Sequence, residues 1–295
     1  MIQVILGIIL LIIGGEIAIT TSEKISKKFG ISNLTIGLSL IAIMTSLPEI
    51  FTNIASGIEK EANIALGNVY GSNSSNALLI GGIALLFGVH EKKYKKISNY
   101  LAIIAPIILY FFCSDSRITQ SESIILILIY IFFSKTLFPS KKTKNKKSTT
   151  LETKSLTYIL LSIFLLWTGG NMAVEGAISF SEKFGWSDVF SGLILGFGTS
   201  LPELTVTFAA IKKKNLDMVS GNLIGSNIIN PLIAMPFVTI TGNMDVAIKN
   251  GNEMALAAIA GTFIYILGTI QKKNIKKIIG LISISLFVLL ILNQS

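Results

Sequence analysis

Two identical five-residue stretches place a carboxylate beside a proline within otherwise apolar sequence. Residues 45–49 and 199–203 both read TSLPE, so Glu49 and Glu203 each follow a helix-breaking residue. Proline removes one backbone donor and clashes with the carbonyl one turn earlier, which frees carbonyl oxygens at the level of the motif. The threonine that opens each stretch lies four residues before the glutamate, so hydroxyl and carboxylate share a helix face. Each stretch therefore offers carboxylate, hydroxyl and carbonyl oxygens together.

A second repeated motif supplies amides and more hydroxyls. Residues 67–73 read GNVYGSN and residues 221–227 read GNLIGSN, and both motif pairs are separated by 154 residues. In each copy the motif serine is followed four residues later by an asparagine, which again places both side chains on one helix face. The candidate oxygen ligands at this offset are Thr45, Ser46, Glu49, Ser72 and Asn76 in the first half and Thr199, Ser200, Glu203, Ser226 and Asn230 in the second.

This set of ligands suits a hard cation. No lysine or arginine falls inside an apolar run near either motif, so two converging glutamates require a bound cation or shared protons. Ca²⁺ takes about six to eight such oxygens in a flexible shell, whereas Mg²⁺ keeps its waters. The same oxygens could hold Na⁺ ions in overlapping sites, or protons beside a water-filled cleft. Cys113 is the only cysteine and His90 the only histidine, which excludes soft-metal chemistry.

The composition indicates a protein that crosses a membrane many times. Of the 295 residues 51% are apolar and 14% charged, and the mean hydropathy is +0.70. Apolar runs long enough to cross a bilayer as helices recur along the chain. We expect an all-α polytopic membrane protein with ten spans, at 2–21, 32–58, 62–89, 97–114, 121–138, 155–181, 187–211, 216–240, 250–270 and 276–293.

The repeated motifs divide these spans into two sets of five. Five is an odd number, so the second set must cross the membrane in the opposite sense to the first. We therefore predict a first repeat at 1–138, a basic linker at 139–155 and a second repeat at 156–295. Inverted repeats are typical of transporters, and they place the substrate site near the bilayer midplane, where broken helices of the two halves meet.

The net charge of +9 follows the pattern of membrane topology. Lysines and arginines gather in or beside the odd-numbered connections, including the tract KKTKNKK at 141–147. The positive-inside rule then places the linker in the cytoplasm and both termini outside. Binding to nucleic acid would instead need basic and aromatic residues on one folded face, and we do not expect it. The lysine, isoleucine and asparagine content suggests a low-GC prokaryote, whose plasma (inner) membrane would hold the protein.

The paired motifs resemble the α-repeats of the cation/Ca²⁺ exchanger superfamily, specifically its sodium/calcium exchanger branch. The resemblance covers nearly the whole chain and implies antiport of Na⁺ and Ca²⁺ as transported substrates, with no cofactor, by alternating access. It implies that the first and sixth spans slide across the other helices. The family's ligands map onto Glu49, Glu203, Thr45, Thr199, Ser72, Ser226 and the carbonyls of Ala42 and Gly196.

Several positions depart from the family pattern or select among its branches. Met44 occupies a place where glycine is usual, and Asn230 one where many members carry aspartate, which disfavours cotransport of K⁺. Proton-coupled members carry glutamate in a GNxxE pattern, whereas both motifs here have glycine, which favours Na⁺ as the driving ion. The linker 139–155 is too short for the regulatory Ca²⁺-binding domains of animal members. Glu16 and Glu175 are out of register, and we expect them to face water or headgroups.

Other interpretations remain open from the sequence. The exchanger could be coupled to H⁺ or K⁺, and the same oxygens could serve a channel. An intramembrane lipid-phosphate phosphatase is a further alternative, although phosphate chemistry needs a cation that the motifs lack. Asn76 and Asn230 could join helices rather than bind an ion, and the motif glycines could form packing seams. The lipid bilayer is the expected surrounding, and the sequence indicates no protein partner.

Overall fold

The computed structural model describes residues 2–60, 62–89, 96–137, 153–183, 198–246 and 248–293. Gly196, residues 139–152 of the predicted linker and the first part of the predicted span 187–211 lie outside these ranges. The helical elements in chain order are α1 (Ile2–Phe29), α2 (Asn33–Ile36), η1 (Gly37–Ile41), α3 (Ala42–Thr45), α4 (Leu47–Glu59), α5 (Ala62–Ser74), η2 (Ser75–Ile80), α6 (Gly81–Leu86), α7 (Lys96–Phe112), α8 (Gln120–Leu137), α9 (Thr153–Lys183), α11 (Leu201–Lys212), α12 (Leu216–Ile229), η3 (Asn230–Ala234), η4 (Met235–Thr241), α13 (Ile248–Thr269) and α14 (Lys273–Asn293).

The described helices make an all-helical membrane architecture. Five are long and apolar enough to cross a bilayer, and a sixth span results if the bent pair Asn33–Thr45 and Leu47–Glu59 counts as one. Two shorter apolar helices cover Ile97–Phe112 and Gln120–Ser134. The remaining predicted spans coincide with the interrupted helix α5–α6 or extend outside the described residues. The prediction of a polytopic helical protein is confirmed, and the number ten remains a prediction.

The two proline motifs break their helices in the same way. Ser46 separates α3 from α4 with φ −85° and ψ 4°, and Ser200 precedes α11 with φ −87° and ψ 3°. Pro48 and Pro202 lie in the first turn of the helices that follow, where a missing backbone N–H costs little. In the first repeat the helix axis bends by 42° at this point. The prolines therefore start new helices inside the membrane protein, as the sequence predicts.

Two further spans are interrupted by wider turns. The π-helical turn η2 follows the first GNxxGSN motif, and η3 follows the second. A third π-helical turn, η1, precedes the first TSLPE motif. Such turns leave backbone groups without their regular partners and occur frequently at functional sites. Irregular backbone is thus concentrated around the repeated motifs.

One helix lies in the interior of the bundle and another at its edge. The 18-residue window of the span Leu216–Thr241 is 83% buried, whereas that of Lys273–Leu292 is 22% buried. α12 approaches the broken span so closely that only glycine fits at two of its positions. A Cβ on Gly221 would lie 2.4 Å from the carbonyl oxygen of Leu34, and a Cβ on Gly225 would lie 2.6 Å from the Cβ of Ala42. The motif glycines of the second repeat therefore do form a packing seam.

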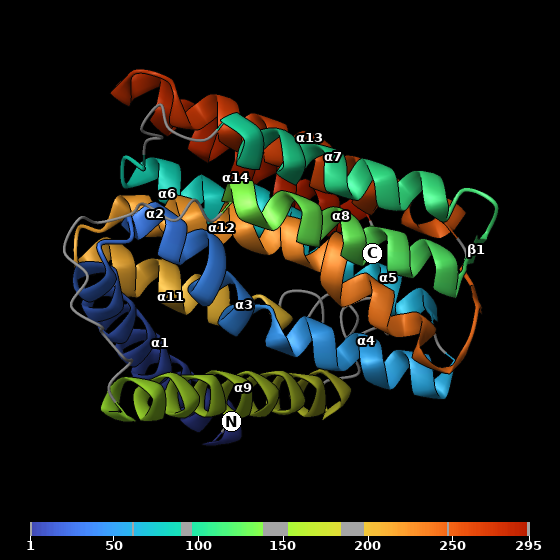
Figure 1. Ribbon diagram of the computed structural model, residues 1–295, viewed down its shortest axis with the longest axis horizontal. Coiled ribbons are helices and arrows are strands. Elements are labelled where there is room, and N and C mark those ends of the chain that lie inside the picture. The colour runs from blue at the N-terminus through green and yellow to red at the C-terminus, as the bar shows by residue number, and fades with distance from the viewer. Residues whose placement is uncertain are drawn as a thin grey trace.

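Helices α1 and α9 form a pair along one edge of the bundle, opposite α7, α13 and α14 (Figure 1). Among the described elements, no two helices contact each other more extensively than these two. A Cβ on Gly169 would lie 2.8 Å from the carbonyl oxygen of Gly7. α9 reaches the broken span through a ring stack of Phe51 on Trp167, with centroids 4.7 Å apart. The pair thus has a close internal contact and a separate contact with the motif helices.

A short sheet joins two connections on the same side of the bundle. Strand β1 (Arg117–Ile118) lies between α7 and α8, and β2 (Met244–Asp245) lies between η4 and α13. The strands pair antiparallel, with Arg117 opposite Asp245 and Ile118 opposite Met244. Because these two connections pair directly, both must lie on the same side of the membrane.

Candidate cation site

The two motif glutamates are completely buried. Glu49 lies in the first turn of α4 and Glu203 in the first turn of α11, and both side chains have 0% exposure. Within the described residues neither carboxylate pairs with a lysine or arginine, and their charges lie close enough to repel each other. Both carboxylate oxygens of Glu49 and Oε2 of Glu203 lack a hydrogen-bond partner in the described part of the chain. Two buried acids are thus brought near each other with no lysine or arginine paired to them among the described residues.

The threonine of each TSLPE motif contacts the GNxxGSN motif of the other repeat. Thr199 Oγ1 donates to Asn68 Oδ1 across 3.1 Å and lies 3.0 Å from Ser72 Oγ. Thr45 Oγ1 donates to Asn222 Oδ1 across 3.2 Å and lies 3.5 Å from a serine hydroxyl, that of Ser226. These two reciprocal contacts each join one repeat to the other. It brings the predicted threonine and serine ligands of both halves beside the two glutamates.

The motif serines at the helix breaks are buried and unpaired. Within the described residues, the hydroxyls of Ser46 and Ser200 have no hydrogen-bond partner and no exposed surface. The carbonyl of Ala42 accepts the N–H of Ser46 at 3.0 Å and lies 3.4 Å from Thr45 Oγ1. A carbonyl oxygen has two lone pairs. The role of the Ala42 carbonyl as a ligand of the ion remains a prediction. Its counterpart Gly196 lies outside the described residues.

Asn76 and Asn230 both leave their side-chain oxygens unpaired. Asn76 is fully buried, and neither atom of its amide has a partner in the described region. Asn230 Nδ2 donates to Asn73 Oδ1 across 3.0 Å, while its Oδ1 has no partner there. Asn230 therefore joins helices through its nitrogen and offers its oxygen to a ligand, so the two roles considered from the sequence are compatible. A buried unpaired amide oxygen is costly, and a bound cation would satisfy it.

Four asparagines outside the predicted ligand set support it. Asn68 and Asn222 accept from the motif threonines of the opposite repeat. Asn73 Nδ2 donates to the carbonyl of Asn227 across 3.1 Å, and Asn227 Nδ2 donates to Thr262 Oγ1 across 2.9 Å. All four occur inside GNxxGSN at the same repeat offset as the predicted ligands. That offset is the signal by which the sequence could have revealed them.

The donor atoms of this cluster determine its chemistry. Carboxylate, amide, hydroxyl and carbonyl oxygens converge there. Among the described residues, no group of three or more His, Cys, Asp or Glu side chains is placed to hold a metal ion. Neutral oxygens with two carboxylates balance one divalent or two monovalent hard cations. Such a cluster can bind and release ions, and it lacks the basic group that phosphate chemistry needs.

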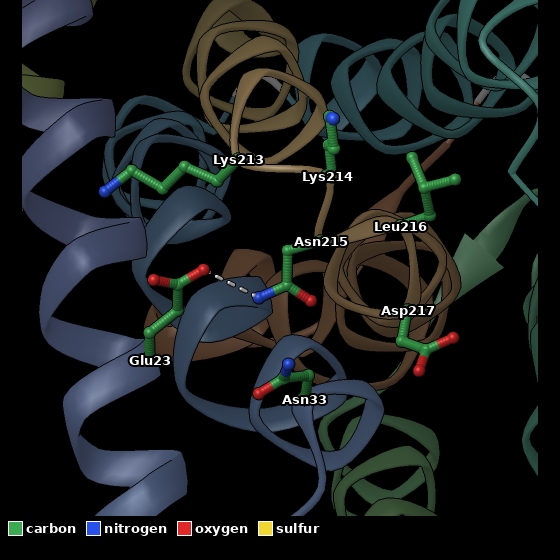
Figure 2. Close-up of a pocket in the computed structure, with 7 residues that line it drawn as sticks. All are labelled: Glu23, Asn33, Lys213, Lys214, Asn215, Leu216 and Asp217. Carbon is green, nitrogen blue, oxygen red and sulfur yellow. Dashed lines mark hydrogen bonds between the residues drawn. The ribbon is translucent and has the colours of Figure 1, made fainter.

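A separate polar pocket of about 330 Å³ opens at the connection between α11 and α12 (Figure 2). None of the predicted ligands lines it; its lining residues are Glu23, Asn33, Lys213, Lys214, Asn215, Leu216 and Asp217. Asn215 Nδ2 donates to Glu23 Oε1 across 3.0 Å. Beside the pocket, Lys213 Nζ pairs with Glu16 Oε1 at 3.1 Å. Glu16 therefore pairs with a lysine, and its side chain is 44% exposed.

Broken helices, a buried pair of acids and reciprocal contacts between two repeats define a polytopic membrane protein of the transporter class. The chain belongs to the sodium/calcium exchanger protein family, which matches it over residues 1–138 and 154–295. The predicted resemblance is thereby confirmed. Family membership makes the chain a cation/Ca²⁺ antiporter and not an enzyme.

Individual relatives agree with this assignment. The sodium/calcium exchanger MaX1 of Methanosarcina acetivorans is 28% identical over 273 residues, covering 76% of this chain and 78% of its own length. The inner membrane protein YrbG of Escherichia coli is 28% identical over 264 residues, covering 82% and 80%. A solved structure of the sodium-calcium exchanger NCX_Mj, soaked with Na⁺ and Sr²⁺, superposes with a TM-score of 0.85 at 25% identity, covering 97% and 96%.

Proposed function

We propose that this protein exchanges Na⁺ for Ca²⁺ at a site built on Glu49 and Glu203. The observation that carries the proposal is the pair of fully buried carboxylates with unpaired oxygens and no basic partner among the described residues. Buried charge of this kind is stable only when a cation or a proton neutralises it. Ions that compete for one set of oxygens are exchanged rather than carried together. The names of MaX1 and NCX_Mj as sodium/calcium exchangers support the choice of ions.

The proposed ligands are those predicted from the sequence. They are Glu49, Glu203, Thr45, Thr199, Ser72, Ser226, Asn76, Asn230, Ser46, Ser200 and the carbonyls of Ala42 and Gly196. Glycine at the last position of GNVYG and GNLIG, in place of a glutamate, supports Na⁺ rather than H⁺ as the driving ion. The neutral amide of Asn230 supports exchange without K⁺.

The proposed topology has ten spans in two inverted repeats, with both termini outside and the linker 139–155 in the cytoplasm of a prokaryotic cell. The pairing of β1 with β2 supports one shared side for the fourth and eighth connections. The hydrogen bond from Asn215 to Glu23 supports one shared side for the first and seventh. Resemblance to an inner membrane protein of Escherichia coli supports the plasma membrane as its location. Alternating access would move the α1–α9 pair against the motif helices.

The experiment is flux through protein reconstituted in liposomes, with the Na⁺, K⁺ and H⁺ gradients imposed one at a time. We expect uptake of ⁴⁵Ca²⁺ when Na⁺ is loaded inside and absent outside, and no uptake driven by a pH gradient alone. Collapse of the Na⁺ gradient with an ionophore should stop uptake. Uptake that follows the pH gradient, or that requires K⁺, would contradict the proposed coupling. A large unitary current in a planar bilayer would contradict antiport itself.

A further inference from the structure

Among the buried positions at which the two halves of the candidate site differ, one lies next to a pair of contacts that the two halves share. Asn53 lies one turn after Glu49 on α4, and the residue in register with it, 154 positions later, is Thr207 on α11. Both side chains have 0% exposure. The next residues in the chain of contacts, Asn68 and Asn222, are identical in the two repeats. The difference between Asn53 and Thr207 therefore shows what Asn53 adds to its half of the site.

Asn53 fixes the orientation of the Asn68 amide. Asn68 Nδ2 donates to Asn53 Oδ1 across 2.9 Å and to the backbone carbonyl of Glu49 across 3.3 Å. Both partners are acceptors only, so the two amide protons of Asn68 must point toward them. The amide oxygen of Asn68 then faces Thr199, whose Oγ1 lies 3.1 Å away. Asn53 thereby determines which end of the Asn68 amide meets the site.

This orientation also bears on the hydroxyl of Thr199, a proposed ligand. Thr199 Oγ1 donates to Asn68 Oδ1 across 3.1 Å and lies 3.0 Å from Ser72 Oγ, a contact in which either hydroxyl can be the donor. An acceptor that Asn53 holds in place favours a Thr199 hydroxyl turned toward Asn68, which leaves the lone pairs of the Thr199 oxygen for a cation. Asn53 therefore supports one proposed ligand of the site.

The other half has no such anchor. In the described part of the chain, Asn222 Nδ2 and Thr207 Oγ1 have no hydrogen-bond partner. Asn68 Nδ2, in contrast, has two acceptors, the side chain of Asn53 and the carbonyl of Glu49. The amide of Asn68 is therefore held on its nitrogen side, whereas that of Asn222 is not.

We propose that Asn53 is a positioning residue for Ca²⁺ binding, acting through Asn68 on Thr199. The inference rests on the proposed function, because it assigns the Thr199 hydroxyl to a Ca²⁺ site. Ca²⁺ needs many oxygens in place at once, so loss of one oriented hydroxyl weakens its binding. Asn53 itself contacts Asn68 and need not touch the ion. Its effect should therefore fall on Ca²⁺ affinity, with little effect on the maximal rate of exchange.

The test uses ⁴⁵Ca²⁺ binding to purified protein in detergent, together with Na⁺-driven uptake in liposomes. Asn53→Leu removes the acceptor at similar volume, and Asn53→Thr installs the residue of the second repeat, which keeps the test available if the leucine variant does not fold. Loss of one buried hydrogen bond should raise the half-saturating Ca²⁺ concentration by roughly fivefold. The matched control is Thr207→Val, whose hydroxyl has no partner in the described region and should leave affinity unchanged.

A double exchange of the two residues distinguishes positioning from packing. Asn53→Thr combined with Thr207→Asn moves the anchor to Asn222 and should recover Ca²⁺ affinity relative to Asn53→Thr alone. Wild-type affinity in Asn53→Leu, equal weakening by Thr207→Val, or no recovery in the double variant would overturn the assignment. If the wild-type protein binds Ca²⁺ but shows no Na⁺-driven uptake, only the antiport proposal is contradicted. The variants can then still be compared by Ca²⁺ binding. Wild-type protein that binds no Ca²⁺ would overturn both.

Discussion

The hydroxyl of Thr199 donates a 3.1 Å hydrogen bond to the side chain of Asn68, which lies 131 residues earlier in the chain. Its counterpart, Thr45, makes the equivalent 3.2 Å bond to Asn222. Each TSLPE motif thus meets the GNxxGSN motif of the opposite repeat and not only its own. Duplication explains why both motifs recur, and this reciprocal contact explains why both copies must be kept together. A site shared between halves is the arrangement that alternating access requires.

The first prediction concerns the two carboxylates. Glu49→Gln and Glu203→Gln each remove one of two charges that balance the ion while keeping the shape of the side chain. Breaking a buried charge pair costs about 3 kcal/mol or more, so Na⁺-dependent ⁴⁵Ca²⁺ uptake should fall by over roughly a hundredfold. Folding should persist, as judged by size-exclusion chromatography in detergent. Glu59→Gln, at the exposed end of the same helix as Glu49, is the control and should transport normally.

Retained exchange in both glutamine variants would rule out the proposed site. The two positions are separable, because only Glu203 accepts a hydrogen bond from a site hydroxyl in the described residues, that of Ser226. A defect in one variant alone would therefore show that the two halves contribute unequally to the bound ion.

The second prediction concerns the neutral amide of Asn230. Its oxygen is unpaired in the described region while its nitrogen is held by Asn73. Asn230→Asp adds one negative charge beside the candidate ion, so the half-saturating Ca²⁺ concentration should fall by roughly tenfold or more, as for a charge-assisted contact. The added charge should also make transport sensitive to K⁺. Asn76→Asp is the matched change in the other repeat, and unchanged ion dependence in both would remove the ligand role of these amides.

Much of the arrangement could be predicted from the sequence because its causes are local. Apolar length identifies the membrane helices, and Pro48 and Pro202 locate the breaks, since proline acts on its own helix. The offset of 154 residues pairs the candidate ligands of the two halves. The burial of Glu49 and Glu203 follows from their place in apolar runs. These features need no knowledge of which helix packs against which.

The cross-repeat contacts could not be predicted in the same way. The bond from Thr199 to Asn68 depends on how α11 approaches α5, and a repeat offset alone is compatible with contacts within a repeat or between repeats. The π-helical turn η2 likewise depends on tertiary packing, because the sequence around Ser75 carries no proline to signal a break, whereas η3 contains Pro231. The difference between Asn53 and Thr207 is visible in the sequence, yet its meaning needs the contact from Asn53 to Asn68.

The third prediction concerns Met44, which stands where the family usually has glycine. Its side chain is 3% exposed, and its sulfur lies 3.9 Å from the hydroxyl of Ser162 on α9. Met44→Ala should leave a cavity between α3 and α9 and cost about 2–4 kcal/mol of stability, seen as a lower thermal midpoint in detergent. Ile43→Ala is the control on the preceding residue, because Ile43 is 43% exposed and has less packing to lose. Equal destabilisation by the two variants would contradict a packing role for the methionine.

The fourth prediction concerns the close approach of α12 to the broken span. Gly221→Ala would place a Cβ 2.4 Å from the carbonyl oxygen of Leu34, and a backbone atom cannot move aside without separating the helices. The variant should lose about 1–3 kcal/mol of stability, as overpacked cores do, and its thermal midpoint in detergent should fall. Gly170→Ala is the control, because its added Cβ would meet only Pro202 Cγ at 3.9 Å. A methyl group there should be neutral or should stabilise α9 by up to about 1 kcal/mol through helix propensity.

The Gly221→Ala variant should also affect ion binding, because α12 carries Asn222 and Ser226. It should raise the half-saturating Ca²⁺ concentration. Normal stability together with normal affinity would show that the seam tolerates a larger residue.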